Sequence, residues 1–580
     1  MKKERFLIHA VILAVAGFVS RALGLLYAVP LYHIIGEEGN GYYGTAYEIY
    51  NMLLLITAYS MPMAISKIMS VYVAEKDYVN CKRLFRTCLF YVIVVGGIGA
   101  VVTYIFADSF VITPAALSLR VMAPTIFFSG ILSVLRGYTQ AHNTMIPTAV
   151  SQMVEQLFNA VCSIVFAVVL VRFASAGGGQ GILDFLGIDG NYVYAQAGKN
   201  STMSENDMTI PPTAFGAMGS ALGTLVGVLV ALIYMVICIM LTKNRRKQQY
   251  VTDNSIFDEN RYDIEYKGNT DYSDKSLAPE PYFTLFRIIF MYASPIILTS
   301  FIYNLATTID MKIFWNWALG NGYSQETAAS IFGIYSRQYL VLINVPITIA
   351  SAISSSMLPS LSVEFSSNEL GSVKARISKS VRSVVVCAVP SVVGLMVLSK
   401  PIMQLLFKGT SEAASDALVL GSISVLFFSV ATVINTALQA MGKSLIAIKN
   451  VTRALIIHIL YVVGMLKVSG AVMGILVTGS VLYSMAMCIG NIKSLEKYFG
   501  CKLRVLSLIG KPVIASLIMG VISILAYTLL NSVGLGIFLS LLITVGISVI
   551  AYFVMFYFKD DYMVKTIFRK SIRVKIKAKK

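Results

Sequence analysis

The stretch Phe18–Gly36, FVSRALGLLYAVPLYHIIG, lies in an almost unbroken apolar run that begins at Phe6 and carries an arginine near its middle. A run of this length can cross the hydrocarbon core of a bilayer as a helix. A guanidinium at the centre of such a helix costs at least about 2.5 to 3.5 kcal/mol on insertion scales, so chains rarely keep one without a use. Arg21 is therefore the first candidate functional residue. The run is too long for a cleaved signal peptide, and we expect it to be retained.

The composition extends this interpretation to the whole chain. Of its 580 residues, 57% are hydrophobic and 13% are charged, and the mean hydropathy is +0.74. These values predict an all-α polytopic membrane protein with about fourteen transmembrane helices. The expected spans centre near Ala16, Ser60, Gly96, Ser129, Ala160, Gly227, Thr299, Asn344, Gly394, Val430, His458, Gly479, Met519 and Gly546.

Basic residues crowd alternate loops. They recur in MKKER at the start, KNRRK at 243–247 and the tail FRKSIRVKIKAKK, whereas GEEGNGYYG at 36–44, read as a loop, has none. Because basic loops stay on the cytoplasmic side, both termini are predicted to be cytoplasmic. The net charge of +18 then reflects this bias and a tail that rests on anionic lipid headgroups, rather than nucleic-acid binding.

The cysteines and histidines show no spacing typical of a metal or cofactor site. The seven cysteines form no C-x-x-C pair, and His9, His33, His142 and His458 are widely separated. This pattern suggests neither a disulfide framework nor a metal centre, and no cofactor is predicted.

Two similar segments suggest an internal repeat. FFSGILSVLRGYTQA begins at Phe127, and FFSVATVINTALQA begins at Phe427. Parallel repeats of six spans each predict two lobes around a central cavity, followed by two further spans. The expected parts are an N-terminal lobe (1–242), a cytoplasmic linker (243–283), a C-terminal lobe (284–504), two C-terminal helices (505–558) and a basic tail (559–580).

Several motifs carry a family resemblance. They are SRALGLLYAVPLYHIIGEEGNGYYGTAYEIYNMLL (20–54), MPMAISKIMSVYVAEKDY (61–78), SQMVEQL (151–157), TTID (307–310) and YSRQYLVLINVPITIASAISSSMLPSLS (335–362). The chain resembles the polysaccharide-exporter branch of the MOP superfamily, and within it the Gram-positive group of MurJ-type lipid II flippases and stage V sporulation protein B. The resemblance implies two six-helix lobes with two terminal helices, a monomer, and outward transport of undecaprenyl-linked sugar precursors across the plasma membrane of a Gram-positive bacterium.

The resemblance also assigns two arginines to the substrate. Arg21 matches the arginine of the first-span S-R-x-x-G motif, which is associated with the lipid pyrophosphate. Arg337 matches the eighth-span arginine of the A-D-R motif in Gram-negative flippases, although Ser336 replaces the aspartate here. Leu340 and Tyr27 also stand where those proteins have a glutamate and a second arginine. For Arg21 the alternative is a structural ion pair with Glu155 or another carboxylate.

Three further polar residues complete the predicted substrate site. Lys67 lies toward the cytoplasmic end of its span, where its long side chain can also snorkel to water. Glu155 belongs to a polar stripe that is expected to face a wet cavity and that also includes Gln152, Gln156 and Asn159. Asp310 matches a family aspartate and is a candidate carrier of a coupling ion, either a proton or Na⁺, with surface exposure near the outer end as the alternative.

Three classes of function remain. The first is a flippase for a lipid-linked oligosaccharide, most of all lipid II, with capsular, teichoic or sporulation-specific precursors as alternatives. The second is a multidrug cation antiporter, which would need a cavity dominated by carboxylates. The third is a membrane-embedded transferase, and no clustered catalytic acid and base supports it. The sequence therefore favours a transporter, not an enzyme, whose partners are its lipid-linked substrate and membrane lipids.

Overall fold

The computed structural model describes residues 2–59, 61–74, 77–142, 144–185, 210–257, 279–501 and 505–558. These residues form helices and connecting turns, and no strand occurs among them. Within the described ranges, eleven helices are long and apolar enough to span a membrane, or twelve if one bent pair counts as a single span. The all-α membrane class is confirmed, whereas the count of fourteen spans is not established.

The chain divides into two compact units. The first comprises residues 1–23, 49–170 and 218–301, and the second comprises 24–48, 171–217 and 302–580. Four helices contribute to both units: α1 (Lys2–Leu54), α6 (Ile146–Phe173), α9 (Pro212–Phe257) and α10 (Tyr282–Gly320). The lobe boundaries expected from the sequence stay a prediction.

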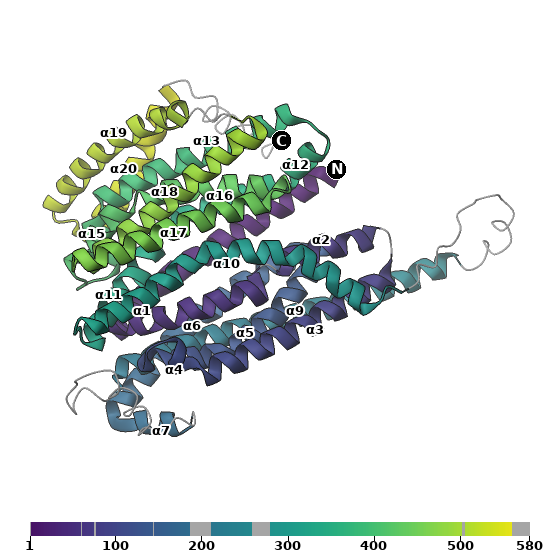
Figure 1. Ribbon diagram of the computed structural model, residues 1–580, viewed down its shortest axis with the longest axis horizontal. Coiled ribbons are helices and arrows are strands. Elements are labelled where there is room, and N and C mark those ends of the chain that lie inside the picture. The colour runs from purple at the N-terminus through teal and green to yellow at the C-terminus, as the bar shows by residue number, and fades with distance from the viewer. Residues whose placement is uncertain are drawn as a thin grey trace. The chain divides into compact units, whose positions relative to one another are not determined.

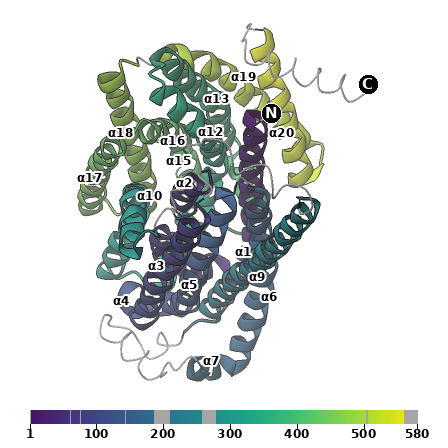
Figure 2. The same cartoon turned by 90° about the vertical axis from the view of Figure 1, so that its right-hand side faces the viewer.

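The first unit is built around α5. The helices that lie wholly within it are η1 (Leu55–Tyr59), α2 (Met61–Ala74), α3 (Tyr78–Ile105), α4 (Ala107–Phe110) and α5 (Thr113–Ala141). Helix α5 packs against both α2 and α3, and Figure 2 shows α3 and α5 side by side. Apolar side chains such as Ile65, Leu84 and Val134 fill this contact and are fully buried.

The second unit is built around α16. Its helices are η2 (Ala174–Gly178), α7 (Gly179–Phe185), α11 (Gln325–Gly333), η4 (Ile334–Tyr339), α12 (Leu340–Ser366), α13 (Leu370–Val397), α14 (Ser399–Leu406), α15 (Glu412–Gly421), α16 (Ser424–Ala440), α17 (Ser444–Val468), α18 (Val472–Phe499), α19 (Val505–Ser532) and α20 (Gly536–Phe558). Helix α16 packs against α12, α13 and α18. Helices α19 and α20 lie side by side (Figure 1), and the hydroxyls of Ser523 and Ser548 are 2.6 Å apart between them.

The internal repeat finds support within each unit. The two similar segments end at Ala141 and Ala440, and each of these residues is the last of its helix. Helix α5 packs on α2 and α3, and α16 packs on α12 and α13. The fourth span of each half therefore makes the same contacts inside its own unit.

The segment GEEGNGYYG is not a loop, contrary to the sequence-based expectation. It continues α1, and only Gly36 leaves helical geometry, with φ 66° and ψ −169°. Glycines here serve close packing instead of turns. A Cβ at Gly41 would lie 1.9 Å from the Ala329 carbonyl oxygen, and one at Gly44 would lie 2.3 Å from Ser336 Oγ.

The long connections before and after the membrane-spanning part of α9 each begin as a helix. Residues 174–185 form η2 and α7, and α9 continues through Phe257 into the expected linker. The rest of these connections (186–209 and 258–278) and the basic tail lie outside the described residues.

The glycines of GAMGSALGTLVG pack closely against α6, as their four-residue spacing predicts. A Cβ at Gly219 would lie 2.6 Å from the backbone of Phe166, and one at Gly223 would lie 2.3 Å from the Ser163 nitrogen. At Gly227 the nearest atom is the Glu155 carbonyl oxygen, 2.6 Å away. All three glycines therefore hold α9 against α6 within the first unit.

Gly223→Ala tests this packing. The added methyl group meets backbone that cannot move aside easily, so we expect a loss of about 1–3 kcal/mol in the free energy of unfolding. Gly464→Ala is the control, because this glycine lies within α17 with no atom near its Cβ position. The control should be neutral or more stable by up to about 1 kcal/mol. Denaturant unfolding in micelles compares the two, and equal stability would contradict the close packing.

Candidate functional site

The polar centre of the second unit is Arg337. It lies on the π-helical turn η4, all six residues of which are buried. Its side chain is 9% exposed, and its Cζ lies 4.6 Å from the Tyr43 ring centroid and 5.6 Å from the Tyr47 centroid. Tyr27 also interacts electrostatically with the guanidinium. The faces of two tyrosines therefore stabilise the guanidinium by cation–π attraction.

Glycines bring the tyrosines to the arginine. Gly41 on α1 faces the backbone of α11, and Gly44 faces the Ser336 side chain of η4. Gly333 on α11 approaches the Glu37 carbonyl in return. Tyr43 and Tyr47 are four residues apart, so they share one face of α1, and their rings stack 5.9 Å apart. A β-carbon at these glycines would separate α1 from η4.

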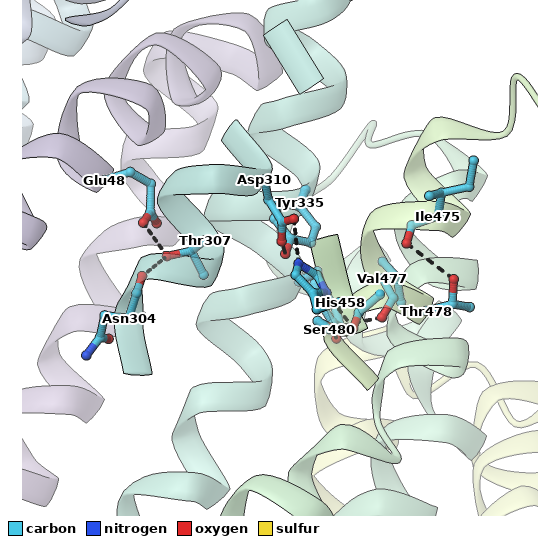
Figure 3. A network of polar contacts seen from close by, with 12 residues as sticks. Glu48, Asn304, Thr307, Asp310, Tyr335, His458, Ile475, Val477, Thr478 and Ser480 are labelled. Carbon is cyan, nitrogen blue, oxygen red and sulfur yellow. Dashed lines mark hydrogen bonds and ion pairs between the residues drawn. The ribbon is translucent and has the colours of Figure 1, made fainter. Parts of the chain in front are cut away.

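The charge of Arg337 has no direct carboxylate partner among the described residues. Its Nε is buried without a hydrogen-bond acceptor. Glu48 lies in the same region, but its carboxylate accepts a hydrogen bond of 2.7 Å from the Thr307 hydroxyl (Figure 3). A buried guanidinium with an open donor is suited to binding an anion.

A second polar pair lies close by, between α10 and α17. Asp310 Oδ1 is 2.7 Å from His458 Nε2, and Asp310 Oδ2 accepts a hydrogen bond of 3.2 Å from the Tyr335 hydroxyl. The other imidazole nitrogen of His458 lies 2.9 Å from the Gly479 carbonyl oxygen. Figure 3 shows Asp310 facing both Tyr335 and His458. Tyr335 thus joins this pair to the turn that carries Arg337.

This geometry excludes the surface-exposed alternative for Asp310, whose side chain is 1% exposed. The sequence analysis also missed His458, which is equally buried. The two residues are 148 positions apart, so no local spacing could reveal the pair. The available signal was an ionisable side chain at the centre of an apolar span, which by itself marks a functional candidate.

Glu155 pairs with Arg136 in the first unit, with Arg136 Nη2 2.6 Å from Glu155 Oε2. Arg136 Nε also donates to the Ser151 hydroxyl at 2.7 Å. Farther along the predicted polar stripe, Asn159 is buried and its Oδ1 accepts from the Ser163 hydroxyl. Part of the stripe therefore serves helix packing.

Arg21 is exposed on α1 and has no ion pair among the residues that the structure describes. The alternative of a structural pair with Glu155 is therefore wrong. Lys67 lies on α2, but its side chain is outside the described part of the structure. Of the five predicted site residues, Arg337 and Asp310 share the second unit and are linked through Tyr335, while Arg21 and Glu155 belong to the first.

Metal ligands do not gather in this region. Across the described ranges, no group of three or more histidine, cysteine, aspartate or glutamate residues is placed to hold a metal ion.

The sequence is similar to those of several known proteins. The sequence profile described as "Polysaccharide biosynthesis protein" matches residues 7–206. The lipid II flippase MurJ of Bacillus subtilis (strain 168) is 22% identical over 497 residues, which cover 82% of this chain and 81% of MurJ. Stage V sporulation protein B of the same organism is 23% identical over 503 residues, 84% of this chain and 83% of that protein.

Solved structures extend the comparison to the fold. The structure titled "Lipid II flippase MurJ, inward closed conformation" aligns with a TM-score of 0.59 at 14% identity, covering 95% of this chain and 99% of that one. An inward-facing multidrug resistance MATE family transporter of the MOP superfamily aligns with a TM-score of 0.51 at 13% identity, covering 84% and 93%. The fold is shared with these MurJ and MATE structures. The resemblance drawn from the sequence motifs is confirmed, and the apolar helices together with these similarities indicate a multi-pass membrane protein.

A double-mutant cycle on Arg136→Ala and Glu155→Ala tests the pairing in the first unit. We expect a coupling of about 1 kcal/mol or more in the free energy of unfolding, because each single variant leaves a partly buried charge unpaired. The matched cycle on Arg21→Ala and Glu155→Ala should give less than about 0.5 kcal/mol. A larger coupling for Arg21 than for Arg136 would contradict the structure.

Proposed function

We propose that this protein is a flippase that moves an undecaprenyl-pyrophosphate-linked sugar precursor, most of all lipid II, from the inner to the outer leaflet. It would do so by opening alternately to the two sides of the membrane. The observation that carries the proposal is Arg337, a buried guanidinium with an unpartnered Nε and no carboxylate bound to it among the described residues. Similarity to the Bacillus subtilis MurJ supports the choice of substrate.

Pyrophosphate fits the donor set better than a neutral or cationic ligand does. A guanidinium presents a planar fork of donors that matches two phosphate oxygens, and such charge-assisted bonds are about twice as strong as neutral ones. Arg21 offers a second guanidinium, which is exposed at the level of an apolar span and free of a protein ion pair in the described structure. By the family resemblance, we propose that Arg21 and Arg337 each contact the lipid pyrophosphate at some step of transport.

A multidrug cation antiporter shares the fold but suits these residues poorly. A cationic drug would be repelled by Arg337, and Asp310 already has His458 as its partner. A buried site whose free charge is positive favours an anionic ligand. These residues therefore favour a transporter of anionic substrates over an antiporter of cationic drugs.

A second candidate substrate comes from stage V sporulation protein B, whose identity with this chain is almost the same as that of MurJ. Capsular, teichoic or sporulation-specific precursors present the same prenyl pyrophosphate as lipid II does. In this proposal the two arginines bind the prenyl pyrophosphate that all these precursors share, and other residues distinguish the attached sugars.

Arginine-to-lysine substitutions test whether the two guanidinium groups bind the pyrophosphate. Arg21→Lys and Arg337→Lys keep the charge but lose the planar fork, so each should weaken binding of undecaprenyl pyrophosphate in micelles by about tenfold. Arg21→Ala should abolish transport without loss of melting temperature, because the side chain is exposed. The control is Arg376→Lys, an arginine that pairs with Glu364. Stable Arg21→Ala and Arg337→Lys variants that bind as tightly as the wild type would refute the assignment.

Complementation tests the substrate. Expressed in a strain depleted of its essential lipid II flippase, this chain should restore growth, and Arg337→Ala should not. Membrane abundance of both proteins is the control. Failure of the well-expressed wild-type chain would favour a capsular or sporulation-specific precursor.

A further inference from the structure

The Asp310–His458 pair has a hydrogen-bonding pattern that fixes its proton content. The Gly479 carbonyl oxygen can only accept, so His458 Nδ1 must carry a proton and donate it. Nε2 then faces a carboxylate oxygen at 2.7 Å, a distance that requires one proton between the two atoms. That proton sits on His458 as an imidazolium or on Asp310 as a carboxylic acid. In either arrangement the pair is neutral and holds one exchangeable proton.

We propose that Asp310 and His458 form a proton-binding site whose occupancy is linked to binding of the anionic substrate. The ligand of this site is one proton, and no metal cation takes its place. The link to substrate rests on the proposed function, whereas the proton site itself rests only on the geometry of the pair.

Loss of the proton would disrupt the pair. When Nε2–H gives its proton to water, hydronium forms, and the pair changes from neutral to a charge of −1. The bare Nε2 lone pair would then face a carboxylate oxygen at 2.7 Å, which is repulsive. Because burial strengthens this repulsion, the two side chains must separate until a proton returns.

Tyr335 links the protonation state of the Asp310–His458 pair to the position of Arg337. Tyr335 donates to Asp310 Oδ2 and precedes Arg337 by two residues on η4. Movement of Asp310 therefore moves the turn that carries the buried guanidinium. A new negative charge in this region also opposes an anionic ligand at Arg337, so the substrate binds more tightly to the protonated form.

Several other titratable groups act on the pair. The Tyr483 ring lies 5.7 Å from the His458 ring, and its hydroxyl is engaged by the Tyr303 carbonyl at 3.0 Å. The Tyr339 hydroxyl is 3.0 Å from the Ser480 hydroxyl and interacts electrostatically with Asp310. Glu48 also acts on Asp310 electrostatically, and its carboxylate is held by Thr307. None of these groups inserts between Asp310 Oδ1 and His458 Nε2.

A metal cation does not fit between the two side chains. An ion that bridged them would have to hold Nε2 and Oδ1 farther apart than a hydrogen bond does. The second imidazole nitrogen is already committed to a backbone carbonyl, and the described residues contain no larger group of potential ligands here.

Proton uptake on ligand binding tests the link. Undecaprenyl pyrophosphate is titrated calorimetrically into the purified protein at fixed pH values between 5 and 9, in buffers of different ionisation enthalpy. In the pH range where the free pair is deprotonated and the ligand-bound pair is protonated, the wild type should take up more protons per molecule, up to about one, than Asp310→Asn or His458→Gln does. His33→Gln, which changes an exposed histidine of the same unit, should match the wild type. Protons taken up or released by the ligand itself contribute equally to the wild type and the variants, so they cancel in the difference in proton uptake.

Magnetic resonance of ¹⁵N-histidine protein tests the proton site without a substrate. The wild type should show a protonated His458 Nδ1 and a strongly downfield bridging proton at Nε2, which disappears in Asp310→Asn and persists in His33→Gln. Absence of the bridging proton would overturn the proton site. Equal proton uptake by the wild type and Asp310→Asn, or ligand affinity that depends on Na⁺ at constant pH, would overturn the link. If undecaprenyl pyrophosphate does not bind at all, the proposed function fails and the resonance result still decides the proton site.

Discussion

A buried positive charge in a membrane-spanning unit must be compensated, and here two aromatic faces contact it directly, while the Glu48 carboxylate acts on it electrostatically from the same region. Arg337 lies over Tyr43 and Tyr47, because the missing side chains of Gly41 and Gly44 let α1 approach η4 closely. Ring faces lower the cost of burial without neutralising the charge. The guanidinium therefore keeps its charge, which the proposed binding of an anion requires.

The same π-helical turn connects two kinds of chemistry. Tyr335 reaches Asp310, and Arg337 lies two residues further on, so the proposed proton site and the proposed anion site share one short element. Single π-helical turns are rare and recur at functional sites, because the extra residue re-aims the side chains around it. The unit thus has a structural path by which protonation and ligand binding can influence each other.

The sequence predicted those features that depend on composition and local spacing. Apolar runs gave the membrane class, the spacing of Gly219, Gly223 and Gly227 gave a close helix contact, and motifs singled out Arg337 and Asp310. The sequence did not predict the features that depend on contacts between residues far apart in the chain. The glycines of GEEGNGYYG suggested a loop because their use in packing depends on Ala329 and Ser336, nearly 300 residues away. His458 was passed over because its partner is on another helix.

The most direct test of the account is a cryo-electron microscopy structure of the protein with lipid II bound. The account predicts pyrophosphate density within hydrogen-bonding distance of the Arg337 guanidinium, with Asp310 and His458 still in contact. Density for the pyrophosphate elsewhere, with Arg337 stacked on Tyr43 and Tyr47 and touching no ligand, would contradict the central claim that this buried arginine binds the substrate.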